Sequence, residues 1–290
     1  MKIAIGTANF GMNYGIKSDD LALPREEILS ILNAAHRHKI TDIDTAKSYG
    51  NCETVLGECG VGSFQVTTKI IIDQDHTKLG FEAWLLDQIE DSLAKLKIDK
   101  LYGLLVHNSD ALLSVDGGVV ASALEKARKL GLVKKVGFSI YSPSNLNFIT
   151  EKFWPDLLQS PYNILDHRLA CSGWLNVLKN NGTEVHCRSV FLKGLITTSV
   201  EQRPPYFSRW KHVFDGLDRT AAFMGLSQAE LCLIDVLKNH HIDKIVVGVQ
   251  SERQLLELVE MCSSSFQVNI PSFCSDDLDL IEPYRWPANL

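Results

Sequence analysis

The sequence of 290 residues has no excess of basic residues, no long apolar run and no paired cysteine motif. Its 29 Lys and Arg against 35 Asp and Glu give a formal net charge of −6. This balance argues against nucleic acid as a partner, because phosphates require cations to neutralise them. No apolar run approaches the roughly 18 residues that span a bilayer, so we expect no membrane segment. The first residues reach Gly6 and polar side chains too early for a secretory signal peptide.

Cysteine is present seven times, an odd number, and never in a CxxC spacing. This usage is typical of reduced thiols and not of a disulfide framework or a zinc site. We therefore expect a cytoplasmic protein without a bound metal. The apolar content of 45% with 22% charged residues is ordinary for a folded chain with a sizeable core.

Strand-like and helix-like segments alternate along the whole chain. Strands are expected at 3–7, 40–44, 64–70, 101–106, 133–139, 157–159, 184–189 and 244–249. Helices are expected from Pro24 to about 35, and at 53–58, 84–96, 119–130, 143–152, 171–180, 212–223 and 227–240, with a last one beginning at 251–252. This order predicts an α/β fold, a (β/α)8 TIM barrel, with residues 1–290 as a single domain. A doubly wound sheet is the competing fold, but it calls for a G-x-G-x-x-G loop, which the segment from Gly6 to Gly11 does not provide.

Ionisable residues end three successive predicted strands. Asp44 ends the second, Lys69 the third, and His107 follows the fourth, while Tyr49 stands five residues after Asp44. Active sites of barrels lie at the carboxyl ends of the strands. A buried carboxylate also needs a partner, and Lys69 is the candidate partner of Asp44.

These residues resemble the catalytic tetrad of the aldo-keto reductase superfamily, Asp, Tyr, Lys and His in this order. The match includes the pattern Asp-Thr-Ala-x-x-Tyr-Gly at 44–50 and runs from Gly6 to about Glu257. The resemblance implies reduction of an aldehyde or ketone by a nicotinamide cofactor. A phenol has a pKa of about 10, so Tyr49 as general acid would rely on the Lys69 ammonium to favour its phenolate. Asp44 would hold Lys69, and His107 would orient the carbonyl oxygen.

The resemblance also implies cofactor contacts. They comprise Gly6, Thr7 and Asp44 near the nicotinamide, Ser139 and Gln159 at the carboxamide, Arg188, Ser189 and Phe191 after the seventh strand, and Gly248, Ser251, Arg253, Gln254 and Glu257 after the eighth. Arg188 stands where many members place an aromatic residue that stacks on the nicotinamide. The backbone amides around Ser189 and Phe191 would cradle the pyrophosphate.

The expected cofactor is NADP(H), with NAD(H) possible, because Ser251 and Arg253 offer a hydroxyl and a cation to a 2′-phosphate. We expect this preference to be shallow. The chain departs from the family pattern at Ile140, where Asn is common, and at Leu258, which replaces an asparagine. It also starts directly on its first strand, without the N-terminal hairpin that covers the barrel floor in many members.

One other function remains open on the sequence, a nucleotide-binding regulatory or sensor subunit, which would bind the cofactor with little turnover. A phosphate-binding barrel enzyme is disfavoured, because it would need a glycine-rich loop, for which Lys193, Gly194 and Gly248 are too few. The substrate is expected to be a compact polar carbonyl, such as one derived from a sugar, and the oligomeric state is left open.

Three further segments carry expectations of their own. The loop 203–212 is either a solvated connection or a flap over the pocket. The C-terminal tail, with Phe273, Tyr284 and Trp286, would fold back over the pocket mouth, as it does in the superfamily. The segment 166–168 is expected to be a surface ion-pair cluster.

Overall fold

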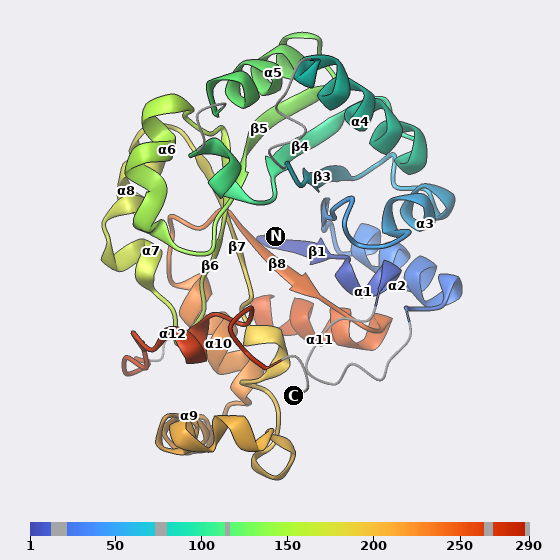
Figure 1. Cartoon of the computed structure of the whole chain (residues 1–290). Helices are drawn as coiled ribbons and strands as arrows, with labels where there is room; N and C mark the ends of the chain where they lie inside the picture. Colours follow the sequence, from blue (N-terminus) through green and yellow to red (C-terminus); the bar gives the residue numbers. More distant parts are fainter. Residues whose placement is uncertain (13–21, 73–79, 114–116, 264–268, 288–290) are drawn as a thin grey trace.

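Eight parallel strands close into a barrel in sequential order (Figure 1). The computed structural model describes residues 1–12, 22–72, 80–113, 117–263 and 269–287. The strands are β1 Ile3–Gly6, β2 Asp42–Asp44, β3 Gln65–Ile70, β4 Leu101–Val106, β5 Val133–Ser139, β6 Leu157–Pro161, β7 Glu184–Arg188 and β8 Lys244–Gly248. Each strand pairs with its neighbour in sequence and β8 pairs with β1. The expected (β/α)8 TIM barrel is confirmed.

Helices surround the strands in Figure 1. The α-helices are α1 Ala8–Gly11, α2 Arg25–Arg37, α3 Cys52–Cys59, α4 Phe81–Leu96, α5 Gly117–Lys129, α6 Leu146–Lys152, α7 Arg168–Cys171, α8 Trp174–Asn180, α9 Lys211–Met224, α10 Gln228–Leu237, α11 Glu252–Ser263 and α12 Leu278–Ile281. Short 3-10 segments are η1 Ser109–Leu112, η2 Pro143–Asn145, η3 Leu192–Gly194, η4 Val200–Gln202 and η5 Pro205–Trp210. The expected helix at 227–240 ends earlier, at Leu237, so His240 and His241 lie in the loop before β8.

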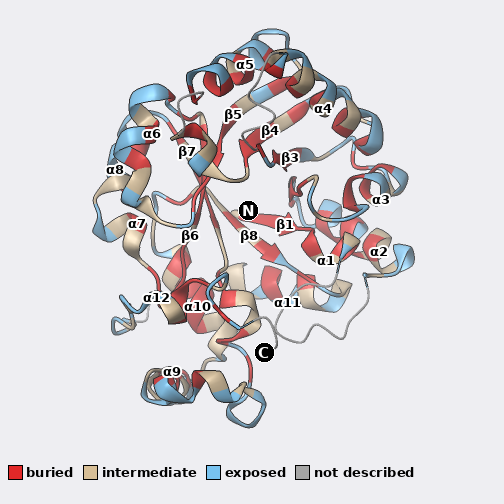
Figure 2. Ribbon diagram, in the orientation of Figure 1, coloured by how far each residue is buried: buried red, intermediate tan, exposed pale blue. Residues whose placement is uncertain are grey.

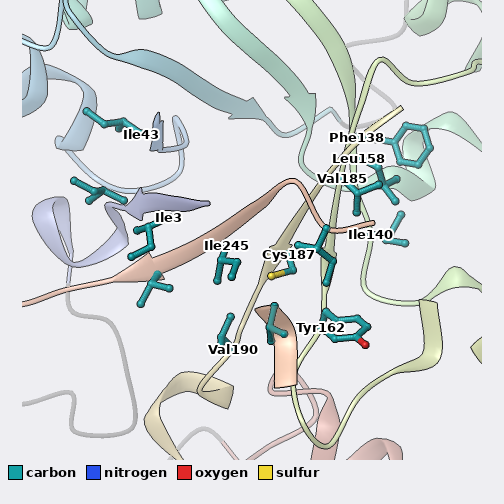
Figure 3. Close-up of a cluster of buried hydrophobic side chains, with 14 of the residues drawn as sticks. Ile3, Ile43, Phe138, Ile140, Leu158, Tyr162, Val185, Cys187, Val190 and Ile245 are labelled. Atoms are coloured by element: carbon teal, nitrogen blue, oxygen red, sulfur yellow. The ribbon is translucent and has the colours of Figure 1, made fainter. Parts of the chain in front are cut away.

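The apolar core lies between the barrel and the helices. Paired residues of parallel strands point to the same side, and successive residues alternate. One alternate set therefore faces the helices, and Figure 3 shows part of it, with Ile3, Ile43, Phe138, Leu158, Val185 and Ile245 labelled. On the helix side, α2 buries Ile28, Ile31, Leu32 and Ala35, the positions that the helical spacing predicts. Figure 2 shows the buried faces of the helices turned toward the strands.

The other alternate set faces the barrel interior and is unusually polar. It contains, among others, Asp42, Asp44, Thr67, Lys69, Gln159, His186, Arg188 and Lys244, as the strand register shows. At the amino ends of the strands these groups form ion pairs, Asp42 with Lys244 and Glu184 with Lys135. Glu184 also accepts hydrogen bonds from Tyr102 and His186, each at 2.6 Å.

The hydrogen-bond donors around Glu184 keep its carboxylate ionised. Burial would raise the pKa of this carboxyl, but the hydrogen bonds from His186, Lys135 and Tyr102 hold its pKa well below the usual range. The amino end of the barrel is thus closed by an ionic network, in which Asp42 Oδ1 and His186 Nδ1 have no hydrogen-bond partner among the described residues. Asp44 and Lys69 lie at the opposite end, where the strands have their carboxyl ends, and barrel enzymes place their active sites there.

The loop 203–212 packs on the C-terminal tail. Phe207 and Trp210 are buried, and the Phe207 ring lies 4.9 Å from the Trp286 ring, centroid to centroid. Arg209 pairs with Asp277 and Asp279. The loop is therefore anchored by Phe207 and Trp210, while Ser208, Arg209 and Lys211 are exposed to solvent. In the part of the chain that the structure describes, the loop contributes no residue to the cavity below.

No single helix among the described residues is long and apolar enough to cross a membrane. By length and composition alone, one pair of segments passes that test together, Pro205–Met224 and Gln228–Leu237, which meet at a bend of 89°.

Candidate active site

A buried ion pair stands at the carboxyl ends of β2 and β3. The Lys69 Nζ lies 2.6 Å from Asp44 Oδ1, and the two side chains are 1% and 5% exposed. Lys69 also donates to the Thr45 carbonyl oxygen at 2.9 Å. The second carboxylate oxygen of Asp44 accepts from Gln159 Nε2 at 2.6 Å. Burial alone would lower the pKa of Lys69, but the Asp44 carboxylate reverses this and raises the pKa, so the ammonium stays charged.

Tyr49 and His107 lie beside this pair. The Lys69 Nζ is 5.3 Å from the centroid of the Tyr49 ring, and the Tyr49 and His107 rings meet edge to face at 6.1 Å. Within the described residues the Tyr49 hydroxyl forms no hydrogen bond, so it is available to a ligand. His107 Nδ1 lies 3.3 Å from Ser48 Oγ. Burial and the nearby cations Lys69 and Arg188 lower the pKa of His107 to about 4, so the imidazole is neutral at neutral pH.

Two glycines let the chain bring Tyr49 to this position. A Cβ on Gly11 would stand 2.1 Å from the Tyr49 carbonyl oxygen, and one on Gly50 would stand 2.3 Å from the Gly11 carbonyl oxygen. Gly50 also has φ of +60°, a conformation that a side chain disfavours. The end of α1 and the turn after Tyr49 therefore approach each other more closely than any other residue type permits.

A cavity of about 390 Å³ opens beside Asp44 and Tyr49, within the size range of small-molecule sites, and Lys69 and His107 lie outside its lining. Of the predicted site residues, it is lined by Gly6, Thr7, Asp44, Tyr49, Gln159, Arg188, Ser189, Phe191, Gly248 and Gln254. Residues from β1, β2, β6, β7 and β8 thus converge on one space, although they are up to about 240 positions apart in the chain.

The inner end of this cavity fits a nicotinamide carboxamide. Gln159 is fully buried; its Nε2 donates to Asp44, while its Oε1 has no hydrogen-bond partner among the residues that the structure describes. A buried acceptor without a donor is costly, and a carboxamide N–H2 group is a donor of the required kind. Thr7 lines the cavity next to Asp44, and its hydroxyl donates to the Asp44 carbonyl oxygen at 2.9 Å.

The loop after β7 is shaped to bind an anion. Five residues other than glycine have positive φ in the described chain, and three of them, Ser189, Leu192 and Lys193, lie in this loop. Backbone in sparsely populated conformations is concentrated at functional sites. The backbone N–H groups of Val190 and Phe191 donate no hydrogen bond within the described residues. Free amides in such a turn can bind phosphate oxygens.

Four predicted cofactor contacts, Ser139, Ser251, Arg253 and Glu257, lie outside the lining of this cavity. Ser139 is buried at the end of β5, paired in register with Gln159. Ser251 caps α11 by accepting from the Gln254 N–H at 3.2 Å. Arg253 is 86% exposed and lies 3.5 Å from Glu257, so these two face solvent on α11.

An acidic residue that the sequence did not suggest lies at the start of α11. Glu27, on α2, accepts a hydrogen bond from the Glu252 N–H at 3.0 Å. Helix N-termini favour anions, and here a carboxylate of the protein occupies part of that position.

Ten residues of the cavity lining were not predicted as site residues, among them Lys193 and Asn9. Lys193 is partly buried in the lining, and burial together with the cation of Arg188 lowers its pKa. Asn9 lines the cavity and donates to the Val249 carbonyl oxygen at 2.7 Å. The only sequence signal for Lys193 was its position two residues after Phe191. The direction of its side chain depends on its left-handed backbone conformation, which the fold of the loop determines.

The segment 166–168 is not a surface cluster, which corrects the expectation. Asp166 is 2% exposed and pairs with Arg168 at 2.9 Å, and Arg168 also donates to Glu282 at 2.6 Å. Arg168 further donates to the Tyr141 carbonyl oxygen at 3.1 Å. This network ties the C-terminal tail to the loop after β5. Tyr284 of the tail consequently lies 5.0 Å from Tyr141, ring to ring.

Comparison with known proteins agrees with this geometry. The model of the Aldo/keto reductase family matches residues 2–269, and the chain belongs to this family. Two curated relatives are L-glyceraldehyde 3-phosphate reductases of Escherichia coli. The O157:H7 protein is 25% identical over 88% of this chain and 82% of its own, and the K12 protein is 26% identical over 80% and 77%. Membership supports an oxidoreductase that acts on carbonyl groups with a nicotinamide cofactor.

Solved structures share the fold. An aldo-keto reductase from Bacillus halodurans, in its holo form, superposes with a TM-score of 0.73 at 18% identity and covers 92% of this chain and 88% of its own. The glycerol dehydrogenase of Gluconobacter oxydans gives 0.70 at 19% identity, with 92% and 88% covered. An aldo/keto reductase from Klebsiella pneumoniae in complex with NADP and acetate gives 0.68 at 18% identity, with 92% and 87% covered.

Proposed function

We propose that this protein reduces a compact polar aldehyde or ketone with NADPH, with Tyr49 as the general acid. The observation that carries the proposal is the arrangement of four side chains at the barrel mouth. A buried Asp44–Lys69 pair lies beneath Tyr49, whose free hydroxyl borders the cavity, and His107 lies edge-on to that ring.

The bound dihydronicotinamide would supply the hydride to the carbonyl carbon. Tyr49 gives its hydroxyl proton to the carbonyl oxygen as negative charge develops there. The Lys69 ammonium, held charged by Asp44, stabilises the resulting phenolate. His107, neutral at neutral pH, donates one N–H to the same oxygen and orients it.

The cofactor assignment rests on the cavity and on one exposed cation. Gln159 Oε1 and the free amides after β7 suit the carboxamide and the pyrophosphate. Arg253 is the nearest cation of α11 for a 2′-phosphate, but it is exposed and shared with Glu257. Glu27 places a negative charge at the same helix end. Both features support a preference for NADPH that is shallow.

The substrate assignment is supported by the relatives. Two relatives act by name on L-glyceraldehyde 3-phosphate, and a structural neighbour is named for glycerol. These are small, polar, sugar-like molecules, which supports a compact polar carbonyl as the substrate.

Tyr49→Phe tests the proposal. The variant should fold and bind NADPH as the parent does but reduce carbonyls about 10²–10⁴-fold more slowly, because it lacks the hydroxyl that gives the oxygen its proton. Single-turnover consumption of NADPH and fluorescence titration of the cofactor measure the two properties separately. Near-parental turnover in the variant contradicts the assignment of Tyr49. Tight cofactor binding by the parent with no turnover of any carbonyl would instead indicate a sensor subunit.

A further inference from the structure

Arg188 differs from nearly every other arginine of the chain. Among the described residues, eight of the ten arginines lie within 4 Å of a carboxylate, whereas Arg188 and Arg219 do not. Arg219 lies on the exposed side of α9. Arg188 lines the cavity, partly buried, next to the tetrad. A guanidinium has five N–H donors in a planar fork that matches a carboxylate or phosphate.

Neighbouring groups hold this guanidinium in place without neutralising it. One terminal nitrogen donates to the Ile140 carbonyl oxygen at 3.0 Å, and the other to Ser189 Oγ at 3.3 Å. The Cζ atom of Arg188 lies 4.8 Å from the centroid of the Tyr141 ring. The Arg168 network described above fixes the Tyr141 backbone and brings Tyr284 against its ring. The cation is therefore preorganised, which reduces the ordering cost of binding an anion.

The guanidinium points to the substrate side of the mouth. Arg188 ends β7, yet besides its bond to Ser189 it contacts Ile140 and Tyr141 of the loop after β5, beyond β6 in the barrel order. Its charge also reaches His107, which follows β4, and contributes to the low pKa of that imidazole. The cavity residues of the β7 loop and β8, including Lys193, lie on the other side of Arg188 in the barrel order. Lys193 thus suits the cofactor phosphates, and Arg188 suits a group beyond the reacting carbonyl.

Among the described lining residues, Asp44 is the single carboxylate, and it is already paired with Lys69. The described lining therefore has no further acid to neutralise Arg188 and Lys193. We infer that the carbonyl substrate carries an oxyanion, a carboxylate or a phosphate, and that Arg188 binds it. This inference rests on the proposed function, because it adds a recognition group to the same site.

Paired substrates of similar size test the inference. Succinic semialdehyde is compared with butanal, and D-erythrose 4-phosphate with D-erythrose, so that the two pairs distinguish a carboxylate from a phosphate. The parent should show a higher kcat/KM for the charged member of at least one pair. Arg188→Gln should lower kcat/KM for that member by about 10–100-fold, the loss expected for a hydrogen-bonded charge. The uncharged member should change by less than about threefold. Arg188→Lys should recover part of the loss.

Arg219→Gln is the matched control, since it removes the other arginine without a carboxylate partner, and it should leave both pairs unchanged. Equal losses for charged and uncharged substrates in Arg188→Gln would overturn the inference and assign Arg188 to cofactor binding or to the structure of the loop. No advantage for either charged member in the parent would overturn it as well.

A binding measurement separates failure of this inference from failure of the proposed function. Tyr49→Phe loaded with NADPH is titrated with the same four compounds and followed by tryptophan fluorescence. If the parent reduces none of them, the proposed function fails, and the ratio of dissociation constants then decides the inference alone. A charged member should bind about tenfold or more tightly than its uncharged partner, and adding Arg188→Gln should abolish that difference. Equal dissociation constants reject recognition by Arg188.

Discussion

Lys69→Met would remove the ammonium from a site that water does not reach. Lys69 and Asp44 are 1% and 5% exposed, and their 2.6 Å contact is supported by one bond to the Thr45 carbonyl and one from Gln159. After the substitution the Asp44 carboxylate keeps the Gln159 amide as its side-chain donor. Breaking one side of a buried pair costs about 3–5 kcal/mol, because the remaining charge stays buried without a counter-ion.

Urea denaturation at constant m-value measures this loss as a shift of the midpoint. The control is Lys211→Met, which breaks a pair of the same length, 2.6 Å, between Lys211 and Asp215 on α9. Lys211 is 65% exposed, so this variant should lose less than about 1 kcal/mol. Equal midpoints for the parent and Lys69→Met would refute the buried pair.

The pH dependence of the same variant gives an independent check. Without its ammonium, the buried Asp44 carboxyl should hold a proton more tightly in the folded than in the unfolded state. A raised folded pKa of an acid stabilises the fold at low pH, and this contribution is lost as the pH rises. The stability gap between Lys69→Met and the parent should therefore be smaller at pH 5 than at pH 8. Asp44→Asn combined with Lys69→Met should lose less than the sum of the single losses, by about 1–3 kcal/mol.

Two further predictions concern the cofactor and the imidazole. Arg253→Ala should lower the ratio of NADPH to NADH affinity, and Glu27→Gln should raise it. Each change should be roughly two- to fivefold, the range of a charge at a helix end. Titration of both cofactors measures the ratios, and unchanged ratios reject these two residues as determinants. His107 has a pKa lowered to about 4, so the neutral imidazole persists until the pH falls toward that value. The pH profile of kcat/KM should accordingly show no step near 6.5 from His107, and a step there that disappears in His107→Gln would show that the imidazole titrates normally.

Much of this molecule could be predicted from local sequence. The alternation of strands and helices predicted the closed barrel, because each short apolar run is bounded by turns and followed by a helix with one apolar face. The strand-end positions of Asp44, Lys69 and His107 placed them at one end of the barrel, since parallel strands align their carboxyl ends. The pairing of Asp44 with Lys69 was predictable because a buried charge requires an opposite one.

The rest depended on contacts between segments far apart in the chain. The direction of the Arg188 side chain, toward the β5 loop, follows from Ile140 and Tyr141, about fifty residues earlier. Asp166 and Arg168 resemble a surface cluster locally, but Glu282 of the tail buries them. Glu27 meets the start of α11 across 225 positions because α2 and α11 are neighbours around the ring. Periodicity and composition report which face of an element is buried, whereas these charges acquire their partners only when the closed barrel brings the loops together.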